Sequence, residues 1–400
     1  MPFILDKRLL DSRLAIIVQA FGDLSRLEAY SVLSGSLRSI RVLCDRASLL
    51  NFDTLTTEAV PKLGGIHKYA CPVTFVRPND AQGNVNEFLG KVLQHTNELS
   101  NFSLSLYCAN SDASVYDDVV TSLHEGIRAL GFRKSRLLRP QNQELSADDV
   151  ISRRSVDFVC VPSYEGYHLG ATAYVPAHDL DRRLGTEKPV PSPSISLSPR
   201  LARTLVNLAS LSPGQSLLDP FCGSGTILAE GMLQSLNCIG IDRGPNRIRQ
   251  TQENLSWLQG QEGSARLGAF RVEQGDARDI PRVLNGAMVD GVVTEPILLP
   301  KIHSRPTLRQ AKGMVNQASE VYSKSLRSVA GVLKRGGRLV IVVPVVQALN
   351  GDEVYIILDG ARELGLSEFQ PRGATFDYPV RLSFESTRWV KRGVYVFVRG

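Results

Sequence analysis

The sequence predicts an α/β protein whose carboxyl-terminal half forms a doubly wound, mostly parallel sheet, preceded by two small α+β domains. From residue 199 onward, apolar strand patterns alternate with helical patterns, which is typical of a parallel sheet covered by helices on both faces. Before residue 176, strands and helices alternate less regularly, as they do in α+β domains. The strand patterns at residues 383–385 and 393–398 predict that an antiparallel hairpin closes the sheet.

Length and composition limit the classes of protein that the chain can represent. With 400 residues, of which 43% are hydrophobic and 22% charged, it can bury two or three cores. No apolar run reaches the roughly 18 residues of a membrane span, and residues 1–8 lack the order of a secretory signal. The six cysteines and six histidines are scattered, so we expect a cytoplasmic protein without disulfides or a metal site.

Residues 1–78 are predicted to form the first small domain. Residues 14–18 and 39–44 have strand patterns. Asp23 or Ser25 is predicted to cap the helix between them, and Glu28, three residues after Ser25, fits a capping box. Residues 77–86 are rich in Pro, Asn, Asp, Gln and Gly and are predicted to be a linker.

Residues 98–175 are predicted to form the second small domain. Residues 102–107 alternate like a half-buried strand, and residues 117–130 place apolar side chains along one stripe of a helix. Four cations lie within seven residues directly after this helix: Arg133, Lys134, Arg136 and Arg139. They suit the binding of nucleic-acid phosphates, although a solvated loop would have the same composition.

Residues 176–198 are rich in proline and are predicted to link the small domains to the main domain, residues 199–400. The most informative stretch of that domain is residues 216–227. An apolar strand ends at Asp219, passes through two glycines and opens into a helical pattern. Glycines let the backbone approach a ligand, and the first N–H groups of a helix are free to bind it. A turn that serves only the chain geometry is the alternative.

Three further strands end in acidic residues, and the carboxyl ends of parallel strands share one edge of a sheet. Asp242 ends the second strand, where a carboxylate suits a ribose diol. Asp276 follows the third strand, where it can accept a hydrogen bond from an adenine amino group. Glu295 ends the fourth strand and is the candidate for handling a second substrate, with a helix cap or a surface residue as the alternative.

The spacing favours S-adenosylmethionine over a dinucleotide as the ligand. Dinucleotide folds usually show G-x-G-x-x-G, and no third glycine follows Gly225 at that spacing. Asp219 would repel a pyrophosphate but attract the cationic methionine group. The predicted cofactor-binding residues are Asp219, Pro220, Phe221, Gly223, Gly225, Thr226, Asp242, Asp276 and Ala277.

These features resemble the Rossmann-like class I methyltransferases, and most closely the THUMP-domain tRNA guanosine-N2 methyltransferases that modify position ten. Residues 219–226 fit the family's donor-binding motif D-P-F-C-G-[ST]-G-T. Residues 199–209 fit its P-x-L-A-R-x-[ML]-V-N-L-A helix, whereas residues 182–189 fit its R-D-x-x-R-P connector poorly. By position, residues 98–175 resemble a THUMP domain, which holds the tRNA acceptor end. The resemblance therefore implies tRNA as the partner.

The loop after the fourth strand departs from this family, which has [ND]-P-P-[YF]. There the acid and the carbonyl of the following proline accept hydrogen bonds from the target amine, and the aromatic ring stacks on the flipped base. This chain has Glu295-Pro296-Ile297-Leu298, similar to related sequences with T-E-P-Y-L-G-P. The resemblance implies catalytic roles for Glu295, Pro296 and Thr294, and direct methyl transfer to a guanine N2 amine.

Three other functions are compatible with the sequence. DNA adenine-N6 and cytosine-N4 methyltransferases share the donor fold and the loop, but the THUMP-like front half favours RNA. An RNA-binding protein that binds S-adenosylmethionine with weak catalysis is the second alternative. A nicotinamide-dependent oxidoreductase is disfavoured by the glycine spacing. The sequence leaves open which nucleoside is methylated, whether once or twice, and whether a small activating subunit takes part.

Overall fold

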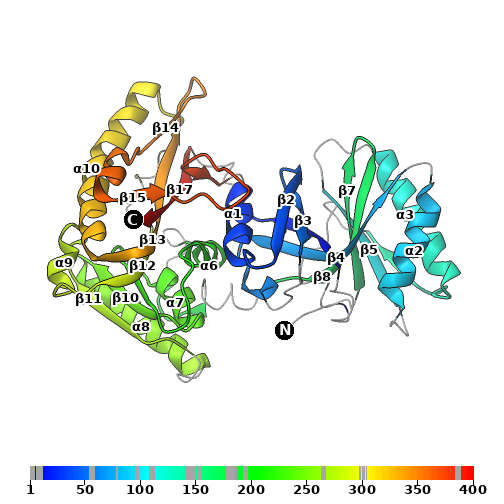
Figure 1. The fold of residues 1–400 in the computed structure, drawn as a ribbon, viewed down its shortest axis with the longest axis horizontal. Helices are drawn as coiled ribbons and strands as arrows, with labels where there is room; N and C mark the ends of the chain where they lie inside the picture. The colour runs from blue at the N-terminus through cyan, green and yellow to red at the C-terminus, as the bar shows by residue number, and fades with distance from the viewer. Residues whose placement is uncertain are drawn as a thin grey trace. The chain divides into compact units, whose positions relative to one another are not determined.

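The computed structural model of the protein (Figure 1) divides into two compact units, Met1–Gly22 with Leu33–His178, and Asp23–Val32 with Asp179–Gly400, here called unit 1 and unit 2. The residues that the structure describes are 5, 12–53, 59–77, 80–94, 99–107, 113–139, 150, 155–176, 185, 187–191, 197–262, 267–296, 299, 302, 304–382 and 389–400.

Unit 1 contains one eight-stranded sheet with the order β2-β3-β1-β4-β8-β7-β5-β6. Its strands are β1 (Leu14–Gln19), β2 (Leu37–Cys44), β3 (Ala47–Phe52), β4 (Ile66–Val76), β5 (Asn101–Leu106), β6 (Arg136–Leu138), β7 (Ser155–Ser163) and β8 (Gly166–Tyr174). The strand β5 is parallel to both β6 and β7, whereas the other pairs are antiparallel. A short helix, η2 (Val60–Lys62), precedes β4.

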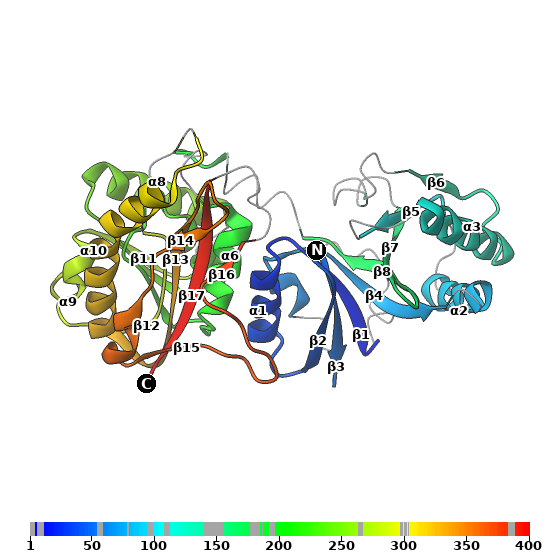
Figure 2. The same ribbon diagram turned by 90° about the horizontal axis from the view of Figure 1, so that it is seen from above.

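The sheet joins the two regions that the sequence predicted as separate small domains, residues 1–78 and 98–175. The strand β4 pairs with β8 along most of its length, with Phe75 opposite His168. The predicted linker at residues 77–86 is also different, because α2 (Ala81–Leu93) begins inside it. Its apolar residues Val85, Phe88 and Leu89 are buried, and α2 packs beside α3 (Ala113–Ala129) (Figures 1 and 2).

The sheet of unit 1 curls so that its first strand meets strands near its other end. On β2, the guanidinium of Arg41 lies 3.0 Å from Nε2 of His168 on β8, and Cys44 Sγ donates to the carbonyl of Tyr107 at 3.5 Å. An apolar cluster that includes Ile16, Ala70, Tyr107 and Val159 fills the curl. Burial and the Arg41 charge lower the pKa of His168 to about 4, so its ring is neutral and accepts the Arg41 hydrogen bond at neutral pH.

A buried carboxylate, Asp157 on β7, joins four strands of this sheet. One of its oxygens accepts hydrogen bonds from the hydroxyls of Ser103 at 2.7 Å and Ser105 at 2.8 Å. The other accepts from Lys68 Nζ and from the Thr172 hydroxyl, both at 2.8 Å. All five residues are at most 2% exposed. The charge of Asp157 is thus paired and fully hydrogen-bonded, which is the condition under which proteins bury a carboxylate.

Unit 2 is built on a nine-stranded sheet whose main path has the order β11-β10-β9-β12-β13-β17-β15. Its strands are β9 (Ser216–Asp219), β10 (Asn237–Asp242), β11 (Phe270–Gln274), β12 (Val289–Thr294), β13 (Leu333–Gln347), β14 (Glu353–Tyr355), β15 (Leu366–Glu368), β16 (Val380–Arg381) and β17 (Val390–Arg399). The strands β11, β10, β9, β12 and β13 are parallel, and β17 lies antiparallel between β13 and β15. This is the predicted doubly wound sheet with antiparallel closure.

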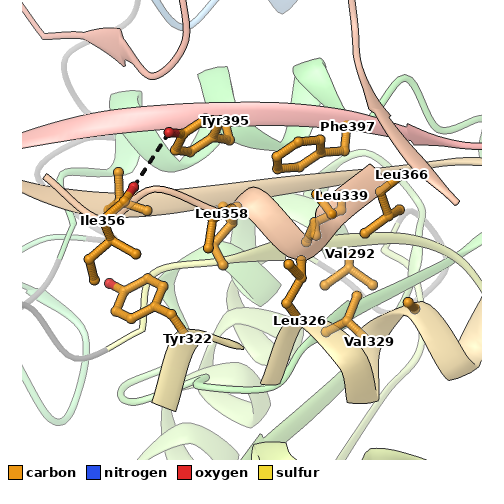
Figure 3. Close-up of a cluster of buried hydrophobic side chains, with 14 of the residues drawn as sticks. Val292, Tyr322, Leu326, Val329, Leu339, Ile356, Leu358, Leu366, Tyr395 and Phe397 are labelled. Atoms are coloured by element: carbon orange, nitrogen blue, oxygen red, sulfur yellow. Dashed lines mark hydrogen bonds between the residues drawn. The ribbon is translucent and has the colours of Figure 1, made fainter. Parts of the chain in front are cut away.

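Helices cover both faces of this sheet. They are α6 (Pro199–Leu208), α7 (Thr226–Leu233), α8 (Pro245–Glu262), η6 (Ala277–Asp279), α9 (Ile280–Val283), α10 (Leu308–Val332) and η7 (Asp359–Leu364). Figure 2 shows α10 and α6 on opposite faces of β13 and β17. Under α10 lies a large core, in which Tyr322 and Leu326 of α10 face aromatic residues of β17 (Figure 3). There the Tyr395 hydroxyl donates to the carbonyl of Ile356 at 3.4 Å.

One helix of unit 2 comes from an early part of the chain. The helix α1 (Asp23–Val32) packs on α6, and Asn207 of α6 donates to the buried Glu28 carboxylate at 2.6 Å. Arg338 of β13 donates to the Ser31 hydroxyl at 3.0 Å. The residues on either side of α1 belong to unit 1, so the chain enters unit 2 twice.

Among the described residues, no helix has both the length and the apolar content needed to cross a lipid bilayer.

Candidate functional site

Four acidic residues end neighbouring parallel strands of unit 2, as the sequence predicts. Along the sheet order, Asp276 follows β11, Asp242 ends β10, Asp219 ends β9 and Glu295 follows β12. The carboxyl ends of parallel strands form the usual ligand-binding edge of an α/β sheet. Burial raises the pKa of Asp219, and the negative charges of Asp242 and Glu295 raise this pKa further.

The turn between β9 and α7 has the backbone conformation that its glycines allow. Gly223 and Gly225 have φ values of 54° and 84°, which are in the left-handed region. A Cβ at Gly225 would lie 2.9 Å from the Thr251 side chain. Any larger residue at position 225 would therefore be strained and would also collide with α8.

The helix α8 fixes this turn through two side chains that the sequence reasoning did not identify. The Thr251 hydroxyl donates to the carbonyl of Gly223 at 2.7 Å, and the Asn254 amide donates to the carbonyl of Ser224 at 3.0 Å. Asn254 also accepts a hydrogen bond from the N–H of Val190 at 2.9 Å, so it joins the turn to the segment before α6. The first turn of α7 is thereby held open at the strand edge.

Asp219 lies beneath the turn and is only 2% exposed. Its Oδ1 accepts hydrogen bonds from the Thr294 hydroxyl at 2.7 Å and from the Phe221 N–H at 3.0 Å. Burial raises the pKa of Asp219 to about 7 despite these two bonds. Thr294, for which the resemblance implies a catalytic role, is itself buried, and its hydroxyl is bound to Asp219.

The other two aspartates have partners of their own. The Asp242 carboxylate accepts hydrogen bonds from the backbone N–H groups of Gly223 at 3.2 Å and Gly244 at 2.8 Å, so it also braces the glycine turn. Asp276 forms two hydrogen bonds with the Arg278 guanidinium, at 2.9 and 2.6 Å, which lower the pKa of its carboxyl to about 2. Next to Asp276, the side chain of Ala277 is buried.

Glu295 is ion-paired with Arg392, a residue of β17 that lies 97 positions away in the sequence. Arg392 Nε donates to Glu295 Oε1 at 2.6 Å, and each side chain is 11% exposed. The pair forms because β17 lies next to β13, which in turn lies next to β12. Pro296 is buried after Glu295, whereas Leu298 lies outside the described residues.

A buried cation, Lys188, lies against the glycine turn. Its Nζ is 3.3 Å from the hydroxyls of both Ser224 and Thr226, and the residue is 6% exposed. No carboxylate pairs with it among the described residues, and burial lowers its pKa to about 8. The sequence signal was the Lys188-Pro189 pair, which stands at the R-P positions of the poorly fitting R-D-x-x-R-P pattern.

Cys222 lies inside the turn but is unsuited to nucleophilic chemistry. Burial raises the pKa of its thiol well above the usual range, so the thiol is protonated at neutral pH. Its side chain is 5% exposed.

The predicted phosphate-binding cations of unit 1 are all exposed. Arg133 and Lys134 lie on the turn after α3, Arg136 begins β6, an edge strand of the sheet, and Arg139 directly follows β6. Among the described residues, none of the four forms an ion pair with a carboxylate. We call Arg133, Lys134, Arg136 and Arg139 the basic edge.

Comparison with known proteins identifies the domain that contains the site. Residues 191–350 match the family model described as "UPF0020: RMKL-like, methyltransferase domain". Over 149 residues the chain is 32% identical to a tRNA (guanine(10)-N2)-dimethyltransferase of Methanothermobacter thermautotrophicus, covering 37% of this chain and 39% of that protein. It is 30% identical over 166 residues to the enzyme of the same name from Pyrococcus abyssi, covering 42% of this chain and 44% of that protein.

Solved structures share the fold over nearly the full length. The crystal structure of TrmN from Thermus thermophilus aligns with a TM-score of 0.52 and 19% identity, covering 97% of this chain and 99% of that chain. The chain spans about two fifths of the length of the curated relatives named above. The predicted class I methyltransferase fold is thus confirmed.

Proposed function

We propose that the chain, whose residues 191–350 match an RMKL-like methyltransferase domain, transfers a methyl group from S-adenosylmethionine to the exocyclic N2 amine of a guanosine in tRNA. The observation that carries the proposal is the position of Glu295 directly after β12, beside the glycine turn and Asp219. The names of relatives that are 30% and 32% identical support tRNA guanine as the substrate.

The residues around the turn fit this methyl donor. Gly223 and Gly225 adopt left-handed backbone conformations at the start of α7, and the first N–H groups of a helix suit a polar ligand. Asp219 suits a cationic group, and Asp242 suits the ribose hydroxyls. Lys188 supplies the positive charge that a methionine carboxylate requires, since no described carboxylate neutralises it. The bound donor supplies an electrophilic methyl group.

The target amine must be made more nucleophilic, because its lone pair is delocalised into the guanine ring. Glu295 and the carbonyl of Pro296 would accept the two amine hydrogens and localise the lone pair on nitrogen. The nitrogen would bond to the methyl carbon as the carbon–sulfur bond breaks, the electron pair of that bond would stay on sulfur in S-adenosylhomocysteine, and the Glu295 carboxylate would accept the proton that the methylated amine releases. Holding the two reactants in line contributes much of the rate, and no covalent enzyme intermediate is required.

The raised pKa of Asp219 and the lowered pKa of Lys188 predict a bell-shaped pH dependence of S-adenosylmethionine affinity. A cationic ligand favours the ionised form of Asp219, so affinity falls as the pH drops below about 7. A carboxylate ligand favours protonated Lys188, so affinity falls as the pH rises above about 8. Calorimetric titration between pH 5.5 and 9.5 would measure both limbs (on the order of one pH unit apart).

The matched variants for this prediction each remove one limb. We expect Asp219→Asn to abolish the acid limb and Lys188→Met to abolish the alkaline limb. The amino group of the donor also titrates near neutral pH, at about 7.7–8.0 for an α-amine, but it does so equally with all three proteins. An alkaline limb in Lys188→Met that is as steep as in the wild-type protein would remove Lys188 from the donor site, because the donor amine alone would then account for it.

The basic edge predicts a salt-dependent contribution to RNA affinity. Replacing all four cations with serine should weaken tRNA binding and reduce the slope of log affinity against log salt by about 3, at roughly 0.7–0.9 per phosphate contact. Filter binding at several salt concentrations would measure the slope. A control removes the same charge from exposed positions of unit 2: Arg282, Lys324, Arg327 and Arg335. Equal slopes for the two variants would refute a specific role for the basic edge.

Substrate class is decided by incubating the protein with isotopically labelled donor and either total tRNA or genomic DNA. Label in N2-methylguanosine of the tRNA supports the proposal. Label only in DNA would identify a DNA amino-methyltransferase. Binding of tRNA without any transfer would identify an RNA-binding protein, an outcome compatible with the engagement of Glu295 by Arg392.

A further inference from the structure

We propose that Trp389 and Arg305 form a stacking platform for a nucleobase of the RNA substrate, on the acceptor side of the Glu295 site. This inference rests on the proposed function and extends it to the residue that replaces the missing aromatic ring of the acceptor loop. Residues 295–298 contain no aromatic side chain, although an extruded base normally stacks on one. The structure places an aromatic residue from elsewhere in the chain at this edge.

Trp389 lies at the carboxyl edge of the parallel sheet. It directly precedes β17, which is antiparallel to β13, so the start of β17 lies where β13 ends. The N–H of Gln347, the last residue of β13, donates to the Trp389 carbonyl at 2.9 Å. Three residues further along, Arg392 reaches Glu295. Three residues of a strand span about 10 Å, which is the order of the length of a nucleoside.

Arg305 reaches Trp389 from the segment that follows the acceptor loop. The N–H of Leu349, just after β13, donates to the carbonyl of Pro306 at 2.8 Å and fixes this segment beside the end of β13. The Arg305 guanidinium carbon lies 5.5 Å from the centroid of the Trp389 ring. The β12 loop, the end of β13 and the start of β17 therefore meet at this pair.

The chemistry of the pair suits a base that is attached to a phosphate backbone. Trp389 is 36% exposed, whereas most large apolar side chains of unit 2 are buried. Among the described residues, Arg305 has no carboxylate partner, and its Nε has no hydrogen-bond acceptor. A cation that lies on an indole ring and is not neutralised can attract a polyanion, while the open part of the ring offers a surface for stacking.

The number of tryptophans in the chain allows a direct test. Trp389 and Trp257 are the two indoles, and Trp257 lies half-buried on α8. In a Trp257→Phe protein, the indole emission comes from Trp389 alone. Titration with tRNA in the presence of S-adenosylhomocysteine should quench this emission saturably, whereas inorganic polyphosphate, which lacks bases, should not. Unchanged emission at tRNA concentrations where filter binding shows a complex would overturn the proposal.

Kinetics provide the second measurement. Stacking of about 1–3 kcal/mol per base corresponds to a loss of roughly 5- to 150-fold in kcat/KM for tRNA in Trp389→Ala. Trp389→Phe should keep most of the activity, and S-adenosylmethionine affinity should be unchanged in both variants. Unchanged kcat/KM in Trp389→Ala would overturn the proposal. If Trp389→Ala fails to fold, Arg305→Gln is the substitute, for which we expect a higher KM for tRNA and a smaller emission change.

Failure of the proposed methyl transfer and failure of the stacking platform would give different results. Wild-type protein that methylates no RNA would contradict the proposed function, but the emission titration would still show whether a base contacts Trp389. Wild-type activity that is insensitive to position 389 would preserve the function and reject the platform.

Discussion

Glu295→Gln is expected to lower the single-turnover rate of methyl transfer to tRNA by roughly 100-fold or more, the usual contribution of a positioned acid–base group. The glutamine retains an oxygen that can accept the Arg392 hydrogen bond, so the ion-paired architecture changes little. The variant loses the negative charge, which makes the Glu295 carboxylate a stronger acceptor for the hydrogens of the guanine amine than a glutamine amide is. Quenched-flow measurement with labelled donor and saturating tRNA would give the rate.

The control for this prediction is donor binding. Calorimetry should show nearly the same affinity for S-adenosylmethionine in Glu295→Gln and in wild type, because the Glu295 side chain pairs with Arg392 and the glutamine keeps an acceptor there. Glu295→Ala is the less informative variant, because it also removes the carboxylate that pairs with the nearly buried Arg392 guanidinium. A Glu295→Gln protein with the wild-type transfer rate would exclude the Glu295 carboxylate as the group that accepts the amine hydrogens during catalysis.

Asp157→Ala is expected to destabilise unit 1 by about 3–5 kcal/mol, because it leaves the Lys68 ammonium buried and unpaired. The hydroxyls of Ser103 and Thr172 also lose their acceptor. Both tryptophans belong to unit 2, so urea unfolding of unit 1 should be followed by circular dichroism while indole emission reports unit 2. We expect the first transition to move to lower urea and the second to stay unchanged.

A double variant can show whether the expected destabilisation comes from the lost ion pair or from lost packing. The double variant Asp157→Leu with Lys68→Met removes both charges together, so it should recover much of the stability, as replacement of buried ion pairs by apolar residues often does. Asp53→Ala, at an exposed position, should have little effect. If the double variant is as unstable as Asp157→Ala, packing and the hydroxyl network carry the stability and the ion pair does not.

Periodicity predicted unit 2 well because its elements are local and regular. The strands that end at Asp219, Asp242 and Thr294 are short apolar runs bounded by turn residues, so their positions follow from the sequence alone. The resemblance to a methyltransferase domain is confirmed by the match over residues 191–350. The THUMP-like assignment of residues 98–175 stays a prediction.

The front half was predicted less well for two physical reasons. The first turn of α2 contains Gly83 and Asn84, which are typical of loops, so composition concealed the apolar stripe that follows. The pairing of β4 with β8 joins segments about a hundred residues apart, and no local pattern encodes such a pairing. The strand β3 was not predicted, although it pairs with both β1 and β2.

In the candidate site, too, local features were predicted from the sequence and tertiary contacts were not. Strand ends and glycines are visible in the sequence, because each is defined by its immediate neighbours. Lys188 and Arg392 reach the site only through tertiary structure, since the first crosses 36 positions to Ser224 and the second 97 positions to Glu295. Arg392 carries no local signature beyond being basic, and the signature of Lys188 is limited to its place before Pro189.

The origin of α1 limits how this protein can be dissected. A fragment that starts at residue 179 would contain every strand of the methyltransferase sheet, yet it would lack the helix whose Glu28 accepts from Asn207 and whose Ser31 accepts from Arg338. The side of α6 that α1 covers would then be exposed to solvent and would favour self-association of the fragment. Exchanging unit 1 between relatives would therefore require residues 23–32 to stay with unit 2, although they lie within the unit 1 sequence.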